Sequence, residues 1–119
     1  VAVQPAGANN LLLGVVRWAQ ISSDRLVAGI QLMPGKPAPV AVRGTGVMAG
    51  QEKYKPGFLL PPLDALKLPA SVVLPLGSFK LERIVEAWSD AGTRQVKLKA
   101  LLDRGADFER AACEAVPQR

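Results

Sequence analysis

An arginine and a tryptophan stand side by side in an apolar stretch, Gly14-Val15-Val16-Arg17-Trp18. A guanidinium group can hold a phosphate, and an indole ring can stack on a base. The pair Arg17 and Trp18 therefore predicts a contact with a phosphorylated, aromatic ligand. Strand geometry gives an alternative, because neighbouring side chains of a strand point to opposite faces. In that case Trp18 would fill the core and Arg17 would point to water.

Residue types that support catalysis are scarce in this sequence. It contains no histidine, which removes the commonest general base and the commonest transition-metal ligand. No serine is followed by a lysine three positions later, so a Ser-x-x-Lys dyad is absent. The carboxylates lie in charge-mixed stretches that are typical of solvated surfaces. We therefore expect no catalytic residues, no metal ligands and no enzymatic activity.

The cysteine content also argues against a metal site and a reactive nucleophile. A single cysteine, Cys113, excludes an internal disulfide and a zinc site built from several thiolates. Its alanine neighbours predict a buried, inert thiol rather than a reactive one. One thiol without a secretory segment favours a reducing compartment, so we expect a cytoplasmic protein.

The glycines of Gly44-Thr45-Gly46-Val47-Met48-Ala49-Gly50 resemble a phosphate-binding loop only superficially. The dinucleotide fingerprint is G-x-G-x-x-G, and the spacing here is one residue longer, with no helical pattern after it. We interpret this segment as a flexible loop.

The charge balance is positive but dispersed. Lysine and arginine number 15 against 10 acidic residues, a formal net charge of +5. Such a chain attracts polyanions, yet no dense basic cluster occurs, so both a solvated mixed surface and an anion site stay open. Lys97 and Lys99 share one face of a predicted strand with Arg94 nearby, which indicates either a basic stripe or a solvated face.

Ten prolines and eleven glycines divide the chain into short pieces that suit strands better than helices. Leu11 to Trp18 and Arg25 to Met33 are apolar strands joined by the polar turn Ser22-Ser23-Asp24, and they predict an antiparallel hairpin. On the second strand, Leu26, Ala28, Ile30 and Leu32 share a face. The run Leu11 to Val16 is too short to span a bilayer.

The second half is also predicted to be β-rich. Ser71 to Leu74 is a short strand, Gln95 to Leu102 alternates like a half-buried strand, and Leu63 to Leu68 is a helical turn. Leu81 to Trp88 is ambiguous, since its apolar residues follow a helical period. The alanines of Phe108 to Val116 leave helix and strand open there.

The hairpin resembles part of the PilZ family of bacterial cyclic di-GMP receptors. PilZ barrels carry a G-x-V-x-W strand, a short turn and a strand ending in G-[VI]-x-[FL], matched here by Gly14 to Trp18 and by Gly29-Ile30-Gln31-Leu32. The family's ligand motifs, R-x-x-x-R and [DN]-x-S-x-x-G, do not occur before Gly14. The resemblance therefore implies either the C-terminal part of a longer PilZ-type protein, which the absent initial Met favours, or a degenerate barrel that binds a protein.

This resemblance shapes the expected fold. We expect a mainly β chain: a small antiparallel β-barrel-like domain with a second β-rich half and room for one or two short helices. The expected parts are PilZ-like strands over residues 1–43, a loop or seam over 44–57, and a β-rich extension over 58–119 that packs on the first half. In this setting Leu81 to Trp88 is expected to be a strand.

The resemblance also implies a function. We expect a non-catalytic signalling or interaction module that relays cyclic di-GMP signals to a protein partner, with Arg17, Trp18 and Gln31 as contact residues. Cyclic di-GMP would be a ligand of the full-length protein, and no other cofactor is expected. The alternatives are a structural or assembly β domain without a small ligand, which would form homo-oligomers, and a weak nucleic-acid-binding domain, which the scattered aromatics disfavour.

Overall fold

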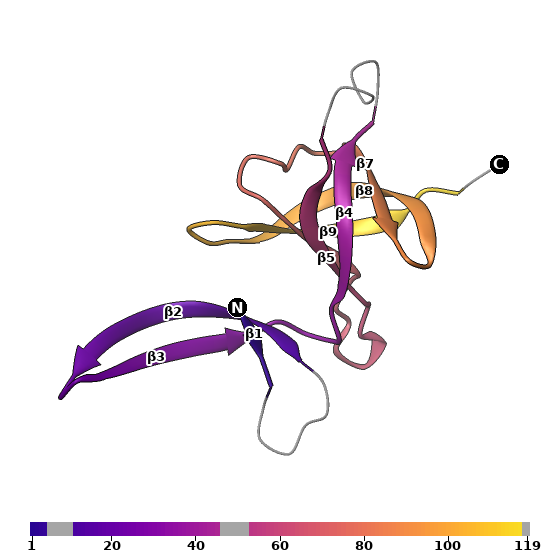
Figure 1. Ribbon diagram of the computed structural model, residues 1–119. Coiled ribbons are helices and arrows are strands. Elements are labelled where there is room, and N and C mark those ends of the chain that lie inside the picture. Colours follow the sequence, from indigo (N-terminus) through magenta and orange to yellow (C-terminus); the bar gives the residue numbers. More distant parts are fainter. Residues whose placement is uncertain (5–10, 46–52, 118–119) are drawn as a thin grey trace.

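The chain is built almost entirely of β-strands in the computed structural model, which describes residues 1–4, 11–45 and 53–117 (Figure 1). One 3-10 helix, η2, covers Asp64–Leu66. The strands are β1 (Ala2–Val3), β2 (Leu12–Ser22), β3 (Arg25–Leu32), β4 (Ala38–Gly44), β5 (Lys55–Leu60), β6 (Ser71–Leu74), β7 (Ile84–Ser89), β8 (Gly92–Arg104) and β9 (Glu109–Ala115). The predicted mainly β fold with a small barrel is confirmed.

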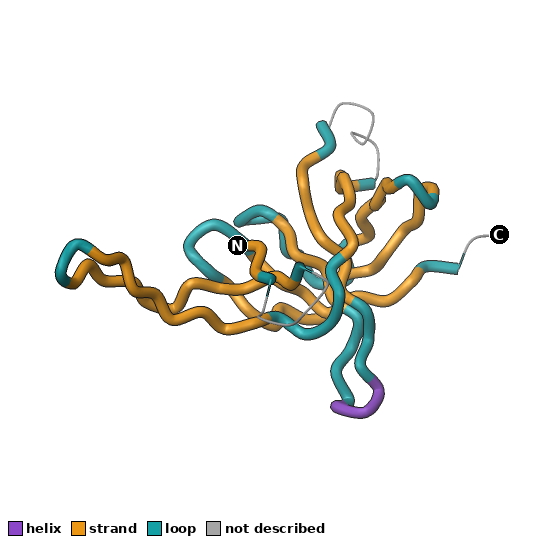
Figure 2. Tube along the Cα trace, turned by 60° about the horizontal axis from the view of Figure 1, so that its bottom comes forward, coloured by secondary structure: helices purple, strands orange, loops and turns teal. Residues whose placement is uncertain are grey.

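Strands β2 and β3 form the predicted antiparallel hairpin. Ser22 pairs with Arg25, so only two residues make the turn. Those residues, Ser23 and Asp24, have φ angles of 50° and 64°. Positive φ at both central positions is what a type I′ turn requires, and its twist matches that of the flanking strands. Figures 1 and 2 show the hairpin extending away from the rest of the molecule. The whole molecule, hairpin included, measures 56 × 32 × 26 Å.

Strand β1 pairs with β2, and the six strands from β4 to β9 close into an antiparallel barrel in the order β4-β5-β6-β9-β8-β7. Every second side chain along each strand points into the barrel, and these side chains fill its interior. The inward-facing core consists of small and branched apolar residues: Val42, Val72, Leu74, Val85, Ala87, Val96, Leu98, Ala111 and Cys113. The barrel therefore needs no aromatic residue at its centre.

Two ambiguous segments of the sequence are strands of this barrel. The residues of β7 pair with both β4 and β8, so the strand expected within Leu81 to Trp88 is confirmed from Ile84 onward. Before it, Glu82 has a φ of 65°, which interrupts any helix. The alanine-rich segment 109–115 is β9, paired with β6 and β8, so tertiary pairing outweighs the helical propensity of alanine.

The expected division into residues 1–43, 44–57 and 58–119 stays a prediction. The observed strands group in another way: β4 pairs with β5 and β7 in the closed barrel, whereas β1, β2 and β3 form a separate three-stranded sheet. The helical turn predicted over Leu63 to Leu68 is present as η2. In the part of the chain that the structure describes, no helix has the length and apolar character to cross a membrane.

Candidate functional site

The base of the hairpin is anchored on the outer wall of the barrel. Leu13, Val15 and Met33 are each 7% exposed and pack with Leu60 of β5 into a second core, separate from the barrel interior. The outward-facing aromatics and valine of the barrel wall complete this core: Phe58, Val73 and Phe108. This anchor fixes where the hairpin leaves the barrel.

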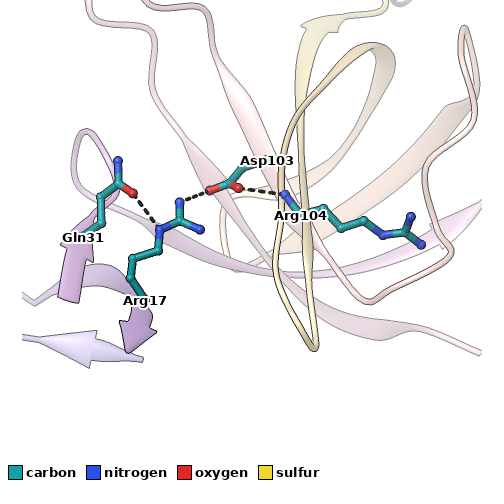
Figure 3. A network of polar contacts seen from close by, with 4 residues as sticks. All are labelled: Arg17, Gln31, Asp103 and Arg104. Atoms are coloured by element: carbon teal, nitrogen blue, oxygen red, sulfur yellow. Dashed lines mark hydrogen bonds and ion pairs between the residues drawn. The ribbon is translucent and has the colours of Figure 1, made fainter. Parts of the chain in front are cut away.

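A polar network stands beside this anchor (Figure 3). The Arg17 Nε donates a hydrogen bond to Gln31 Oε1 at 2.7 Å, and its Nη2 lies 2.8 Å from Asp103 Oδ2 on β8. The other Asp103 oxygen accepts a hydrogen bond from the backbone N–H of Arg104 at 2.8 Å. The network therefore ties the side chains of the hairpin to the barrel and orients the carboxylate that holds them.

Two β-bulges make this contact possible. The pairing of β2 with β3 shifts between Val16 and Trp18, so Arg17 and Trp18 together stand opposite Gly29. The pairing of β8 with β9 shifts between Leu101 and Asp103. A bulge re-aims the side chain at which it occurs. The structure thus brings Arg17 and Gln31 together, on the face that meets the barrel.

Trp18 lies outside this network. Its indole ring occupies the space above Gly29, where a Cβ atom would collide with the ring Nε1. The ring is 53% exposed, so the alternative in which Trp18 fills the core is wrong. The bulge puts Trp18, through its partner Gly29, on the same face as Gln31 instead of opposite Arg17. The ring stays exposed because the hairpin extends beyond its anchor on the barrel.

A cleft of about 460 Å³ opens next to the network, lined among others by Arg17, Gln31, Asp103 and Arg110. The Arg110 Nη1 donates to Ser71 Oγ at 3.3 Å, and its buried Nε has no hydrogen-bond partner among the described residues. The cleft can hold a polar or anionic group, but the charge of Arg17 is already balanced by Asp103.

The hairpin carries an apolar face beyond its anchor. Cross-strand pairs share a face of a sheet, and the pairs on one face are Gly14 with Leu32, Val16 with Ile30, Ala19 with Ala28 and Ile21 with Leu26. We call these eight residues the apolar hairpin face. Its large side chains are 44% to 80% exposed. Two strands without cover are marginally stable in water, so this face is suited to burial against another surface.

The expected basic stripe is broken up by carboxylates. Lys99 Nζ lies 2.8 Å from Glu82 Oε1, and Lys97 Nζ lies 3.7 Å from Glu82 Oε2. The hydrogen bond from Lys99 holds the pKa of Glu82 below its usual value and raises the pKa of Lys99. Arg94 belongs to the opposite face of β8, that of the buried Val96. Lys97, Lys99 and Glu82 therefore form a solvated, charge-balanced face, as the alternative predicted.

Cys113 is 8% exposed within the barrel core, and burial raises the pKa of its thiol to about 11. The predicted buried, inert thiol is therefore what the structure shows. The glycine segment Gly44–Gly50 lies for most of its length outside the described residues. Across the described ranges, no group of three or more acidic, cysteine or histidine side chains is placed to bind a metal ion.

Comparison with known proteins assigns the barrel to a family. Residues 40–116, more than half of the chain, match the model of the FimW C-terminal beta-barrel domain. The chain belongs to this family. The match begins within β4 and ends one residue after β9, so it covers the closed barrel and leaves the hairpin outside. No curated protein and no solved structure matched the chain.

Membership of the FimW barrel family supports the coarse interpretation of a small β-barrel module, and the match itself says nothing of PilZ. Sequence reasoning missed Asp103 and Arg110, the barrel residues beside the hairpin. Asp103 is 86 positions from Arg17, and no local pattern signals such a pair. Nor does Asp103 stand out locally, because it lies in a charge-mixed stretch beside Arg104.

Proposed function

We propose that this chain is the non-catalytic interaction module of a cytoplasmic, PilZ-type signalling protein, and that it passes a cyclic di-GMP signal to a protein partner. The observation that carries the proposal is the apolar hairpin face. A large exposed apolar surface on a projecting element is the usual mark of a protein-protein contact. Its occupant would be a protein with a complementary apolar surface.

The contacts at the base of the hairpin support a proposed route for the signal. Arg17 joins the hairpin to the barrel through Asp103, and Met33 and Leu60 pack beneath them. A change in the orientation of one part would move the other, because the interface has both a packed and a polar component. We infer that the nucleotide is held by residues of the full-length protein, while Arg17, Trp18 and Gln31 line the surface that responds.

The test uses photo-crosslinking in bacterial cells. Benzoylphenylalanine replaces Leu26 at the apolar hairpin face, or Leu66 in η2 as a control of similar exposure, 73% against 67%. We expect a discrete adduct with a second protein only from position 26, and a change in its yield when cellular cyclic di-GMP is raised. Identical adducts from both positions, or a yield insensitive to cyclic di-GMP, would contradict the proposal.

A second candidate is an assembly domain that buries the same face against another copy of the chain. Two copies related by a two-fold axis can bury the same apolar patch against each other. Analytical ultracentrifugation separates the two candidates: a monomer at all concentrations excludes the assembly role, whereas a dimer abolished by Leu26→Glu would support it. Nucleic-acid binding is not proposed, because Glu82 pairs with both Lys97 and Lys99.

A further inference from the structure

One end of the barrel contains an apolar cavity of about 410 Å³, within the range of small-molecule sites. Its walls are inward-facing residues of the barrel and two prolines after β5. Small side chains leave this space unfilled at the mouth, whereas valines and leucines fill the centre of the barrel. The small lining residues are Ala38, Ala70, Ser71, Ala87, Ser89, Ala91, Cys113 and Ala115.

Two cations line this cavity. Arg94 lies two positions before the buried Val96 on β8 and pairs across the sheet with the buried Ala87, so it belongs to the inner face of the barrel. Lys36 comes from the segment between β3 and β4. Within the described residues, neither cation is held by a hydrogen bond or an ion pair.

The charged side chains that line the cavity are all positive. None of the described residues that line the cavity is an aspartate or a glutamate. The cleft at the other end of the barrel is also lined by cations and by no described acidic residue, but its Arg43 is engaged by Glu86 and by the Tyr54 ring. A cation next to an apolar wall attracts an anion that carries an apolar tail, since each part of such a ligand meets its own complement.

We propose that this cavity binds a medium-chain fatty carboxylate, with the acyl chain inside the barrel mouth and the carboxylate at Arg94 and Lys36. Arginine is suited to the head group because its planar fork can donate two parallel hydrogen bonds to a carboxylate. The site is independent of the apolar hairpin face, so this proposal and the proposed function can fail separately.

Calorimetry with the whole chain at pH 7.5 tests the proposal, with decanoate as the probe below its micellar concentration. We expect one molecule bound per chain. Octanoate should bind about fifteenfold more weakly, because it lacks two buried CH₂ groups. Decyltrimethylammonium has the same chain with the opposite charge and should not bind. Equal affinity for the cation and the carboxylate, or no saturable binding of decanoate, would overturn the proposal.

Variants separate the head-group site from general surface charge. The double substitution Arg94→Gln with Lys36→Gln should weaken decanoate binding at least tenfold. The matched control is Arg25→Gln with Lys67→Gln, which removes the same charges at the hairpin tip and beside η2. An equal loss in both double variants would show that only net charge matters and would refute the assigned site.

A readout in the unaltered chain does not depend on the folding of any variant. Cys113 lines the cavity, so decanoate should slow the modification of its thiol by a disulfide reagent at pH 9. Octyl glucoside, which is uncharged, serves as the comparison and should protect less. Modification at an unchanged rate with saturating decanoate would place the ligand elsewhere and contradict the proposal.

Discussion

Arg17 and Asp103 lie 86 positions apart in the sequence, yet their side chains meet at 2.8 Å and join the hairpin to the barrel. Both residues stand at β-bulges, one in β2 and one in β8. The contact is thus a product of two local irregularities, each of which turns a side chain out of the regular alternation of its strand.

The first prediction concerns the strength of this ion pair. Its side chains are 41% and 22% exposed, so solvent screens much of the attraction. A double-mutant cycle with Arg17→Gln and Asp103→Asn should give a coupling energy of about 0.5 kcal/mol, measured by urea unfolding. The coupling should fall when the ionic strength is raised to about 1 M. Coupling that is unchanged by salt would show that packing, not charge, joins the two residues.

The apolar anchor should contribute more than the ion pair. Met33 is 7% exposed beneath the hairpin, so Met33→Ala should lower the free energy of unfolding by about 2 to 3 kcal/mol. Leu26 is 73% exposed on the apolar hairpin face, so Leu26→Ala should change it by no more than about 0.5 kcal/mol. Equal effects of the two substitutions in urea unfolding would mean that the hairpin does not rest on the barrel as described.

The predictability of this fold from sequence varies between its parts for physical reasons. The hairpin could be predicted, because its alternation and the Ser23-Asp24 turn are local signals. The barrel strands β7 and β9 were ambiguous, since their identity comes from pairing with distant strands. Closure of six strands into one barrel has no signature in any single segment.

The residues of the candidate site also divide into those that local sequence predicts and those that depend on the complete fold. Arg17 and Gln31 could be named because they lie on one hairpin, but the environment of Trp18 was misjudged. A single bulge shifts the phase of β2, and neither the position nor the presence of that bulge follows from residue types alone. Asp103 escaped prediction because a contact across 86 positions depends on the completed fold.

The third prediction concerns Gly29, which faces the Trp18 ring. Gly29→Ala introduces a Cβ into space that the indole Nε1 and Cε2 occupy, so the ring must swing outward. In a Trp88→Phe background, the remaining emission of Trp18 should shift to longer wavelength as the ring becomes more hydrated. Gly77→Ala is the control for a general loss of stability, because its φ of 81° strains an alanine although nothing lies within 4 Å of its Cβ position, and it should leave the emission of Trp18 unchanged.

The fourth prediction concerns the pH dependence of the Glu82 and Lys99 pair. The pKa of Glu82 is lowered chiefly by the hydrogen bond from Lys99, so its contribution to stability is complete above the ordinary value of 4.5 and is lost as pH falls through the folded-state value. The pKa of Lys99 is raised, chiefly by the same bond, so its contribution is complete below 10.5 and is lost as pH rises through the folded-state value.

The substitution Lys99→Gln should therefore return the pKa of Glu82 toward 4.5, as an NMR titration of its carboxyl carbon would show. Lys67→Gln, directly after η2, is a matched control with the same loss of charge outside the β7–β8 region that holds this pair. If both variants moved the Glu82 pKa equally, general electrostatics rather than the Lys99 contact would cause the shift.

The last prediction concerns the thiol of Cys113. Burial raises its pKa from 9.0 to about 11, so at pH 8 the thiolate fraction is about a hundredfold smaller than in the unfolded chain. Alkylation by iodoacetamide should be at least that much slower in the folded protein than in urea, because the sulfur is also shielded. Since the raised pKa favours the protonated thiol in the folded state, stability should fall as pH rises between 9 and 11. Cys113→Ala should remove that component of the decline, whereas the same decline in Cys113→Ala would assign it to other groups.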